Sequence, residues 1–412
     1  MTTNLSHDEI LNHALLGVED TKDAQSLIAD KIEMLRHYDV LNMNRALAVC
    51  FWGRSGSMLV ASYLDGHKDV VLLPTTRSMG IYAFFERYQS LSLRDKLMGY
   101  PSFSKDFFQG DFPIAAADYY AAVAAIFKVY GDSPAQLLET RRAFFQFLHV
   151  AYSLALNRRP ATPQPLMVYA QHFTESTLAQ RFIEDFPQAQ FLYTVRDPIS
   201  AFDRMFEQWF KYNSREAASW VVSHLTKSDH AAPGMEARTR TIRFEDMHTK
   251  TAETMYRLAD WLNISHDATL LQSTFNGIPY VVERAGTTWS GPRPEQAARS
   301  CRNVAFTDRA LLFALFYKNF IAWQYSCPKI FGHPLVRGLT LALVWIVPMK
   351  IEIIGARATL KGQVLPSLRR KDFSAAFKSL LRIVRCRLVI MWHIAAHVCR
   401  RLVLRQPVLE LL

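Results

Sequence analysis

The stretch ALAVCFWGRSGSMLVASYLDGHKDVVLLP, residues 46–74, decides the fold. An apolar run over residues 46–52 predicts a buried strand, which Gly53 ends. A helical pattern begins at Met58, and a second short strand is predicted over residues 70–73. A strand, a tight loop, a helix and another strand in this order are typical of the start of an α/β fold.

The rest of the chain alternates predicted strands with predicted helices. We expect further strands at residues 166–170, 190–195 and 240–244, and helices at 8–38, 175–185 and 251–262. This alternation predicts one P-loop-like α/β domain with a central, mainly parallel sheet flanked by helices. The domain is expected at 46–330, with a helical insertion at 79–157 that is a candidate acceptor cap. A helical extension, 1–45, precedes it, and a basic helical tail, 331–412, follows.

The net charge of +11 is concentrated in the tail. Residues 337–412 hold 14 Lys and Arg but only 3 Asp and Glu, so the preceding residues are neutral overall. The five cysteines are scattered without a metal-type pair, which favours reduced thiols and no bound metal. The N-terminus lacks the basic and apolar regions of a secretory signal, so we expect a cytoplasmic protein.

The loop between the first strand and the first helix has the composition of an anion site. Gly53 and Gly56 permit a tight turn, Arg54 supplies charge, and Ser55 and Ser57 supply hydroxyl donors. Backbone N–H groups at such a helix start favour an anion. No GKS or GKT ends the loop, so it is not a Walker loop. An ordinary strand-to-helix turn remains the alternative interpretation of this segment alone.

Five segments, in order, resemble the sulfotransferases that use 3′-phosphoadenosine 5′-phosphosulfate (PAPS). Residues 53–74 are similar to the family's 5′-phosphosulfate loop, (P/G)(K/R)SGTT, with the helix and LLxxHP segment that follow it, and Val195-Arg196-Asp197-Pro198 is similar to its VRDP signature. Residues 243–247 resemble its YED segment, 273–275 its adenine-side TSF segment, and 284–289 its RKGxxGDW loop. The resemblance implies sulfuryl transfer from PAPS to an acceptor hydroxyl. The donor-binding residues that it implies are Gly53, Arg54, Ser55, Gly56, Ser57, Met58, Arg196, Arg204, Ser273, Phe275, Arg284 and Gly286.

Sulfuryl transfer needs positive charge at the leaving group and a base at the acceptor hydroxyl. Arg54, at the family's Lys/Arg position, is the candidate for the first role, and His172 for the second. In one branch of the family a His at this place, just after a core strand, deprotonates the acceptor. A strand-end His that is merely hydrogen-bonded is the alternative. His67 and Glu86 also remain candidates for the base, although His67 is expected to cap the first helix.

Three positions depart from the family's pattern. Met58 replaces a hydroxyl residue, and Phe244 replaces the Tyr of YED. Arg204 stands where the family places a Ser on the 3′-phosphate, so it is expected either to contact that phosphate or to pair with Asp203 or Glu207. These departures motivate a rival interpretation, a non-catalytic peripheral membrane protein on a sulfotransferase scaffold. A P-loop kinase-like phosphotransferase is the other rival.

Two regions bear on the partners. Aromatic residues of the insertion either line an acceptor cleft or form a helical core. The tail alternates apolar and basic runs, which favours binding to an anionic membrane surface over a docked helical cap or an oligomer contact. We expect no nucleic-acid partner, because long apolar runs would serve no phosphate contact. A location on the inner face of the membrane favours a carbohydrate, glycolipid or lipo-oligosaccharide acceptor, for example a nodulation-type signal.

Overall fold

The computed structural model describes most of the chain in two compact units. It describes residues 22–78, 80–104, 107–131, 140–170, 177–213, 216–231, 234–284, 287–297, 301–343, 345–403 and 405–412. The first unit comprises Met1–Cys50, Ser57–Leu192 and Lys250–Pro292. The second comprises Phe51–Gly56, Tyr193–Thr249 and Arg293–Leu412.

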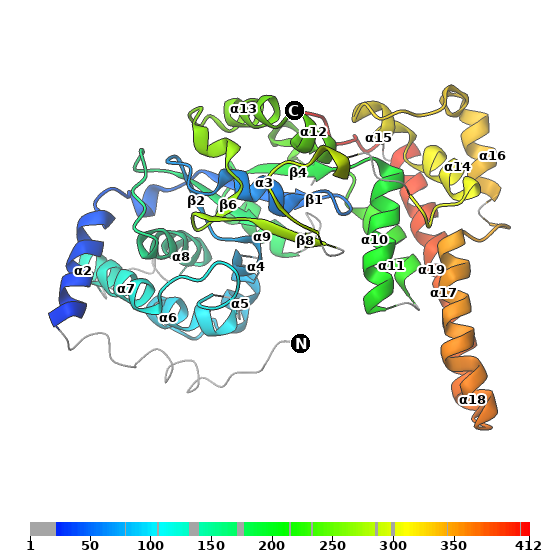
Figure 1. Ribbon diagram of the computed structural model, residues 1–412, viewed down its shortest axis with the longest axis horizontal. Helices are drawn as coiled ribbons and strands as arrows, with labels where there is room; N and C mark the ends of the chain where they lie inside the picture. Colours follow the sequence, from blue (N-terminus) through cyan, green and yellow to red (C-terminus); the bar gives the residue numbers. More distant parts are fainter. Residues whose placement is uncertain are drawn as a thin grey trace. The chain divides into compact units, whose positions relative to one another are not determined.

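A five-stranded sheet, some of whose strands are labelled in Figure 1, organises the chain. Its strand order is β2-β3-β1-β4-β5. Its strands are β1 (Ala46–Phe51), β2 (Val70–Leu72), β3 (Leu166–Ala170), β4 (Gln190–Val195) and β5 (Thr239–Arg243). β3 pairs in parallel with β1 and with β2, and Ala170 lies opposite Val49. The strands read as nearly continuous apolar runs because helices cover both faces of such a sheet. The predicted α/β fold with a central parallel sheet is confirmed.

Helices of the first unit include the predicted insertion. They are α2 (Lys22–Leu35), α3 (Ser57–Leu64), α4 (Thr75–Ser78), α5 (Ile81–Arg87), α6 (Leu93–Phe103), α7 (Ala116–Tyr130), α8 (Arg141–Ala155), α9 (Thr177–Asp185) and α13 (Thr251–Leu262). Two short hairpins follow: β6 (Thr274–Phe275) with β7 (Ile278–Pro279), and β8 (Val281–Arg284) with β9 (Thr287–Ser290).

Aromatic rings form the core of the insertion. Phe84 is fully buried, and its ring centroid lies 5.2 Å from that of Tyr100 and 5.8 Å from that of Phe144. Phe107 contacts Tyr119 in the same way, at 4.9 Å. The contacts with Tyr100 and Tyr119 are edge-on and the contact with Phe144 is stacked, and both geometries are common between aromatic side chains in cores. The structure therefore shows these buried rings as part of a helical core, and an acceptor cleft lined by the partly exposed aromatic residues of the insertion stays a prediction.

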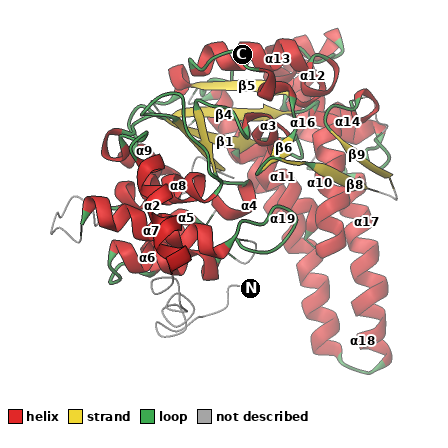
Figure 2. Cartoon of the chain, turned by 60° about the vertical axis from the view of Figure 1, so that its left-hand side comes forward, coloured by secondary structure: helices red, strands yellow, loops and turns green. Residues whose placement is uncertain are grey.

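The second unit carries the rest of the helices. They are α10 (Pro198–Tyr212), α11 (Ala217–Lys227), α12 (Phe244–Thr249), α14 (Phe306–Leu315), α15 (Tyr317–Ala322), α16 (Pro334–Leu343), α17 (Lys350–Thr359), α18 (Leu365–Arg369) and α19 (Phe373–Leu402). A π-helical turn, Leu360–Val364, joins α17 to α18. Figure 2 shows α17 and α18 as one arm of a long hairpin whose other arm is α19. Within the described residues, we find no helix that combines the length and the apolarity needed to cross a bilayer.

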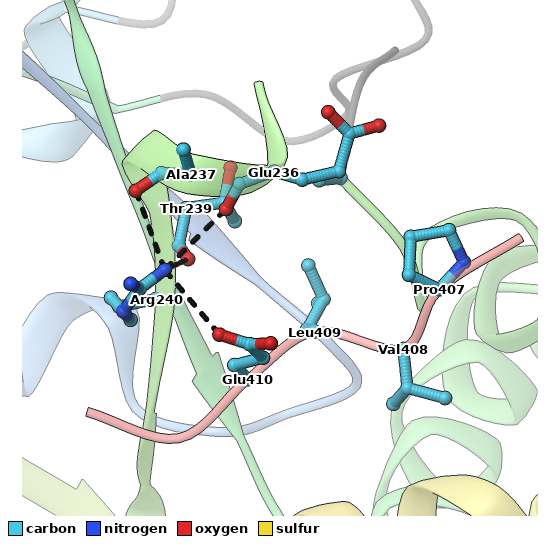
Figure 3. Close-up of a pocket in the computed structure, with 9 residues that line it drawn as sticks. Glu236, Ala237, Thr239, Arg240, Pro407, Val408, Leu409 and Glu410 are labelled. Atoms are coloured by element: carbon cyan, nitrogen blue, oxygen red, sulfur yellow. Dashed lines mark hydrogen bonds and ion pairs between the residues drawn. The ribbon is translucent and has the colours of Figure 1, made fainter. Parts of the chain in front are cut away.

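The end of the chain returns to the edge of the sheet. Leu411 forms a parallel bridge with Thr241 of β5, whose backbone N–H donates to the Glu410 carbonyl at 2.7 Å. The indole N–H of Trp323 donates to the Leu409 carbonyl at 2.9 Å. A small pocket of about 150 Å³ lies beside this segment, where the Arg240 guanidinium meets the Glu410 carboxylate at 3.7 Å (Figure 3). The final residues are therefore an integral part of the second unit.

Candidate active site

The candidate anion loop, residues 51–56, is anchored near its start by the buried side chain of Trp52. Trp52 is fully buried, and its indole N–H donates to the Leu225 carbonyl at 2.9 Å. Its backbone N–H donates to the Thr194 carbonyl of β4, also at 2.9 Å, and its ring lies edge-on to Trp323. A buried aromatic residue with its polar atom satisfied holds the loop in one position.

Two glycines give the loop its shape. Gly53 and Gly56 have φ values of +72° and +86°, which residues with a Cβ rarely adopt. A Cβ at Gly56 would lie 2.8 Å from a ring carbon of Phe244, and one at Gly53 would lie 2.7 Å from the Cβ of Ala201. Backbone conformation and space therefore both require glycine at these positions, as the sequence predicted for a tight loop.

The Ser55 hydroxyl, which the sequence predicts as a donor to the anion, forms a hydrogen bond within the protein. It donates to the Thr194 carbonyl at 2.6 Å, and the side chain is 1% exposed. Because a hydroxyl has one proton to donate, this bond ties the loop to β4 and leaves no hydroxyl proton for a ligand. The loop then offers its backbone, the exposed Arg54 side chain, and Ser57 and Met58, which open α3 and are partly exposed.

Arg196, at the end of β4, is held against the loop. Its guanidinium carbon lies 4.1 Å from the ring centroid of Phe244, and it donates to the carbonyls of Arg54 at 3.3 Å and Gln296 at 2.9 Å. Its buried Nε has no hydrogen-bond partner among the described residues. Burial lowers the pKa of Arg196, and the neighbouring Glu245 carboxylate opposes that shift. A buried arginine with an orphaned donor is suited to an anionic partner.

Glu245 and Tyr325 support this arginine. The Tyr325 hydroxyl donates to Glu245 at 2.6 Å, and the Asp197 backbone N–H donates to the same carboxylate at 3.3 Å. Burial raises the pKa of Glu245, while these bonds favour its charged form. Burial also lowers the pKa of His248 to about 4, with Arg196 adding to the shift, so this imidazole is neutral at pH 7.

Sequence reasoning missed part of this group. The sequence marks Phe244 only as a position without the family's hydroxyl, whereas its ring supplies a cation–π contact to Arg196. Tyr325 and Gln296 carried no signal, because each reaches the site from a distant segment and belongs to no recognisable motif.

Arg204 pairs with Glu207. The guanidinium lies 2.6 Å from the Glu207 carboxylate and is 6% exposed, as one of the two interpretations of this position predicted. The neighbouring Asp203 accepts instead from the backbone N–H of Asn303 at 2.8 Å. Arg204 adds positive charge near Arg196, which contributes to the lowered pKa of that residue.

The predicted adenine-side residues lie inside the first unit. Phe275 is fully buried, and its ring lies 5.2 Å from Phe112 and 5.3 Å from Tyr280. The Ser273 hydroxyl is 2.7 Å from that of Ser62 on α3. Both side chains pack against neighbours, and their contact with the adenine side of the donor stays a prediction.

Several predicted residues fall where side chains are not described. His172 and Gly286 lie outside the described residues, and only the backbone of Arg284 is described, at the end of β8. The alternative bases have structural partners. The His67 ring lies 2.8 Å from the Ser265 carbonyl rather than capping a helix, and Glu86 pairs with Arg141 and Arg181.

The chain also matches a known protein family. The profile of the family described as "Sulfotransferase family" matches residues 47–268. Because the match covers more than half of the chain, the protein belongs to the sulfotransferase family. No curated protein matches the chain significantly.

Three of the solved structures that match the chain are sulfotransferases or sulfotransferase domains. The sulfotransferase domain from the curacin biosynthetic pathway is 18% identical, with a TM-score of 0.41, over 69% of this chain and 99% of that domain. The sulfotransferase domain of the Synechococcus PCC 7002 olefin synthase is 13% identical, with a TM-score of 0.37, over 77% and 96%. Sulfotransferase STF9 from Mycobacterium avium is 11% identical, with a TM-score of 0.34, over 79% and 93%.

Proposed function

We propose that this chain transfers a sulfuryl group from PAPS to an acceptor hydroxyl. The observation that carries the proposal is the arrangement, in the second unit, of the glycine-shaped loop and Arg196, whose buried Nε has no hydrogen-bond partner in the part of the chain that the structure describes. A backbone loop with positive φ at two glycines and a restrained arginine fits a polyanionic ligand. No group of His, Cys, Asp and Glu residues suited to a metal is found among the described residues.

The residues present divide the task as follows. PAPS, when bound, supplies the sulfuryl group and a phosphate leaving group. Arg54 neutralises the charge that develops on the leaving oxygen, and the backbone N–H groups of Gly53 to Met58, with the Ser57 hydroxyl, hold the 5′ end. Arg196 binds the 3′-phosphate, while Arg204 adds positive charge nearby. Arg284 and Gly286 remain our proposal for the closing loop.

His172 is the proposed base that takes the proton from the acceptor hydroxyl. β3 ends at Ala170, which lies opposite Val49 of the parallel strand β1, so the carboxyl ends of the two strands lie at the same end of the sheet, and His172 follows Ala170 by two residues in the sequence. The carboxyl ends of parallel strands are where ligands bind in open α/β sheets. A neutral imidazole with an ordinary pKa of about 6.5 is able to accept a proton at pH 7.

The proposed acceptor is a carbohydrate, glycolipid or lipo-oligosaccharide hydroxyl, reached on the cytoplasmic face of a membrane. The mixed apolar and basic surface of the C-terminal helices supports this proposal, because acceptors assembled at a membrane would be presented there.

Donor binding is tested by calorimetric titration with 3′-phosphoadenosine 5′-phosphate, with ADP as the control ligand. We expect micromolar binding that requires the 3′-phosphate and weakens roughly tenfold to a hundredfold in Arg196→Ala, since a charge-assisted hydrogen bond is lost. Arg240→Ala, a matched change beside the pocket of Figure 3, is expected to bind like the wild type. Equal affinity for ADP, or magnesium-dependent turnover of ATP, would contradict the donor assignment and favour a kinase-like activity.

The base is tested separately. With an acceptor found by radiolabelled sulfate transfer, His172→Ala is expected to lower kcat by about 10²- to 10⁴-fold while leaving donor affinity unchanged. An unaltered pH–rate profile in this variant would exclude His172 as the base and leave the donor site intact.

A further inference from the structure

The C-terminal hairpin has a fixed base and an exposed distal part. At its base, Arg387 pairs with Glu352 at 2.7 Å, and Arg401 forms a buried pair with Asp229. We call residues 353–385 the distal hairpin; α17, the π-helical turn, α18 and the first turns of α19 form it (Figure 2). Its two arms pack on each other, since Ala376, Ser379 and Val364 are buried there.

One face of α19 exposes an apolar stripe along most of the helix. The stripe consists of seven large side chains that are 43% to 70% exposed: Phe373, Phe377, Leu380, Leu381, Val384, Leu388 and Trp392. Their spacing of three, four or one residue keeps them on one side of an α-helix. At 1.5 Å per residue the stripe is about 29 Å long. Such a continuous exposed apolar face marks an interaction surface rather than scattered surface residues.

A basic row runs beside the stripe. Lys378, Arg382 and Arg385 are exposed and lie about 100° around the helix from the centre of the stripe, at 100° per residue. The residues buried against the rest of the second unit, including Ile390 and Ile394, lie on the remaining side. α19 thus has three faces, one packed, one apolar and exposed, and one basic.

The charge of the distal hairpin indicates its partner. It contains eight Lys and Arg and one Asp. A second copy of the chain docked through the same stripe would bring two such basic hairpins together, which is unfavourable. An apolar stripe flanked by cations is the composition of helices that lie in the interface of anionic membranes.

We propose that the apolar stripe of α19 docks on an anionic lipid surface, with the helix parallel to the membrane plane. The parallel orientation follows from the distribution of the stripe, which extends from Phe373 to Trp392 instead of gathering at the α18 end. Trp392 supplies an amphipathic ring of the kind that is enriched at membrane interfaces. The inference is independent of the donor assignment, because it depends only on the surface of the second unit.

Flotation of the full chain with vesicles tests the docking. Binding is expected to phosphatidylcholine vesicles that contain 30% phosphatidylglycerol, but not to pure phosphatidylcholine, and to weaken as salt rises. The double variant Phe377→Glu/Leu381→Glu should bind at least about tenfold more weakly, and so should Lys378→Glu/Arg382→Glu. The control Leu41→Glu/Leu271→Glu changes two exposed leucines of the other unit and is expected to bind like the wild type.

Unchanged flotation of both stripe and basic-row variants would overturn the proposal. A second result would also overturn it: the chain floats with neither kind of vesicle, and it forms a concentration-dependent dimer that Phe377→Glu/Leu381→Glu dissociates. Thermal unfolding of each variant shows whether the fold is retained. If a double variant does not fold, the flotation experiment is repeated with the single variant Phe377→Ser.

Environment-sensitive fluorophores test the orientation. Probes attached through Phe377→Cys and Leu388→Cys lie at separate points of the stripe, and both are expected to shift to the blue on anionic vesicles. A probe at Glu253→Cys, exposed on α13 of the first unit, is the control and should shift little. A shift at position 377 without one at position 388 would contradict the parallel orientation and indicate insertion by the tip alone.

Discussion

The helical insertion and the distal hairpin resemble each other as sequences but differ in what covers them. Both are helical and rich in large apolar side chains. In the insertion, Phe84 and Phe144 are fully buried, and their rings contact each other. In the hairpin, Phe373 and Phe377 are 69% and 61% exposed.

The apolar helical faces of the two regions have different roles because only one of them is covered. α7 and α8 have neighbours on their apolar sides, α2 and α6 among them, so their aromatic residues contribute to stability. The distal part of α19 has its own partner arm on one face, and the stripe lies on another. The stripe is therefore available for association.

The largest expected effect is a difference in the free energy of unfolding between two variants, one that truncates an aromatic ring in the insertion and one that truncates a ring in the distal hairpin. Phe84→Ala should lower the free energy of unfolding by about 3–5 kcal/mol, because it leaves a cavity in a packed core. Phe377→Ala should change it by less than about 0.5 kcal/mol, because the ring is largely exposed. Urea denaturation of the two variants checks this. Comparable losses would mean that the stripe is covered in solution.

The next prediction contrasts the base of the hairpin with its distal part. Arg401→Ala is expected to destabilise the protein by about 3 kcal/mol or more, because the buried carboxylate of Asp229 loses its partner. The same change at the exposed Arg382 should cost less than about 0.5 kcal/mol. Thermal unfolding measures both. If Arg401→Ala left the stability unchanged, the proximal end of the hairpin would not be part of the cooperative folding unit.

The smallest expected effect is a difference in pH dependence. Burial lowers the pKa of His149, in the core of the insertion, to about 4, whereas the unfolded value is about 6.5. The unfolded chain therefore binds more protons between these values, so this contribution to stability is complete above pH 6.5 and is lost as the pH falls towards 4.

Replacing His149 with Gln should reduce this slope by at most about 1.4 kcal/mol per pH unit between pH 6.5 and 4. Urea denaturation at pH 7.0 and pH 5.0 provides the measurement. His393→Gln is the matched change on α19, where burial and two nearby cations lower the pKa of a partly exposed ring. His393 lies on α19 beyond the distal hairpin, so this pair compares the core of the insertion with the packed part of α19. A larger change of slope in His393→Gln than in His149→Gln would contradict the expected order.

The sequence alone determined the sheet and the loop. Strands at 166–170 and 190–195 and the helix at 251–262 coincide with β3, β4 and α13, because each is specified by a local apolar pattern with turn residues at its ends. The need for glycine at positions 53 and 56 could also be predicted, since the tight turn between a strand and a helix requires their backbone freedom.

Only the tertiary structure decided how the candidate site is assembled and which apolar faces are covered. Phe244, Gln296 and Tyr325 reach the neighbourhood of Arg196 from separate segments, and the Ser55 hydroxyl is taken by Thr194. Periodicity shows which side of a helix is apolar, but it contains no information on the element that packs against it. For that reason the aromatic residues of the insertion and the stripe of α19 became distinguishable only in the folded chain.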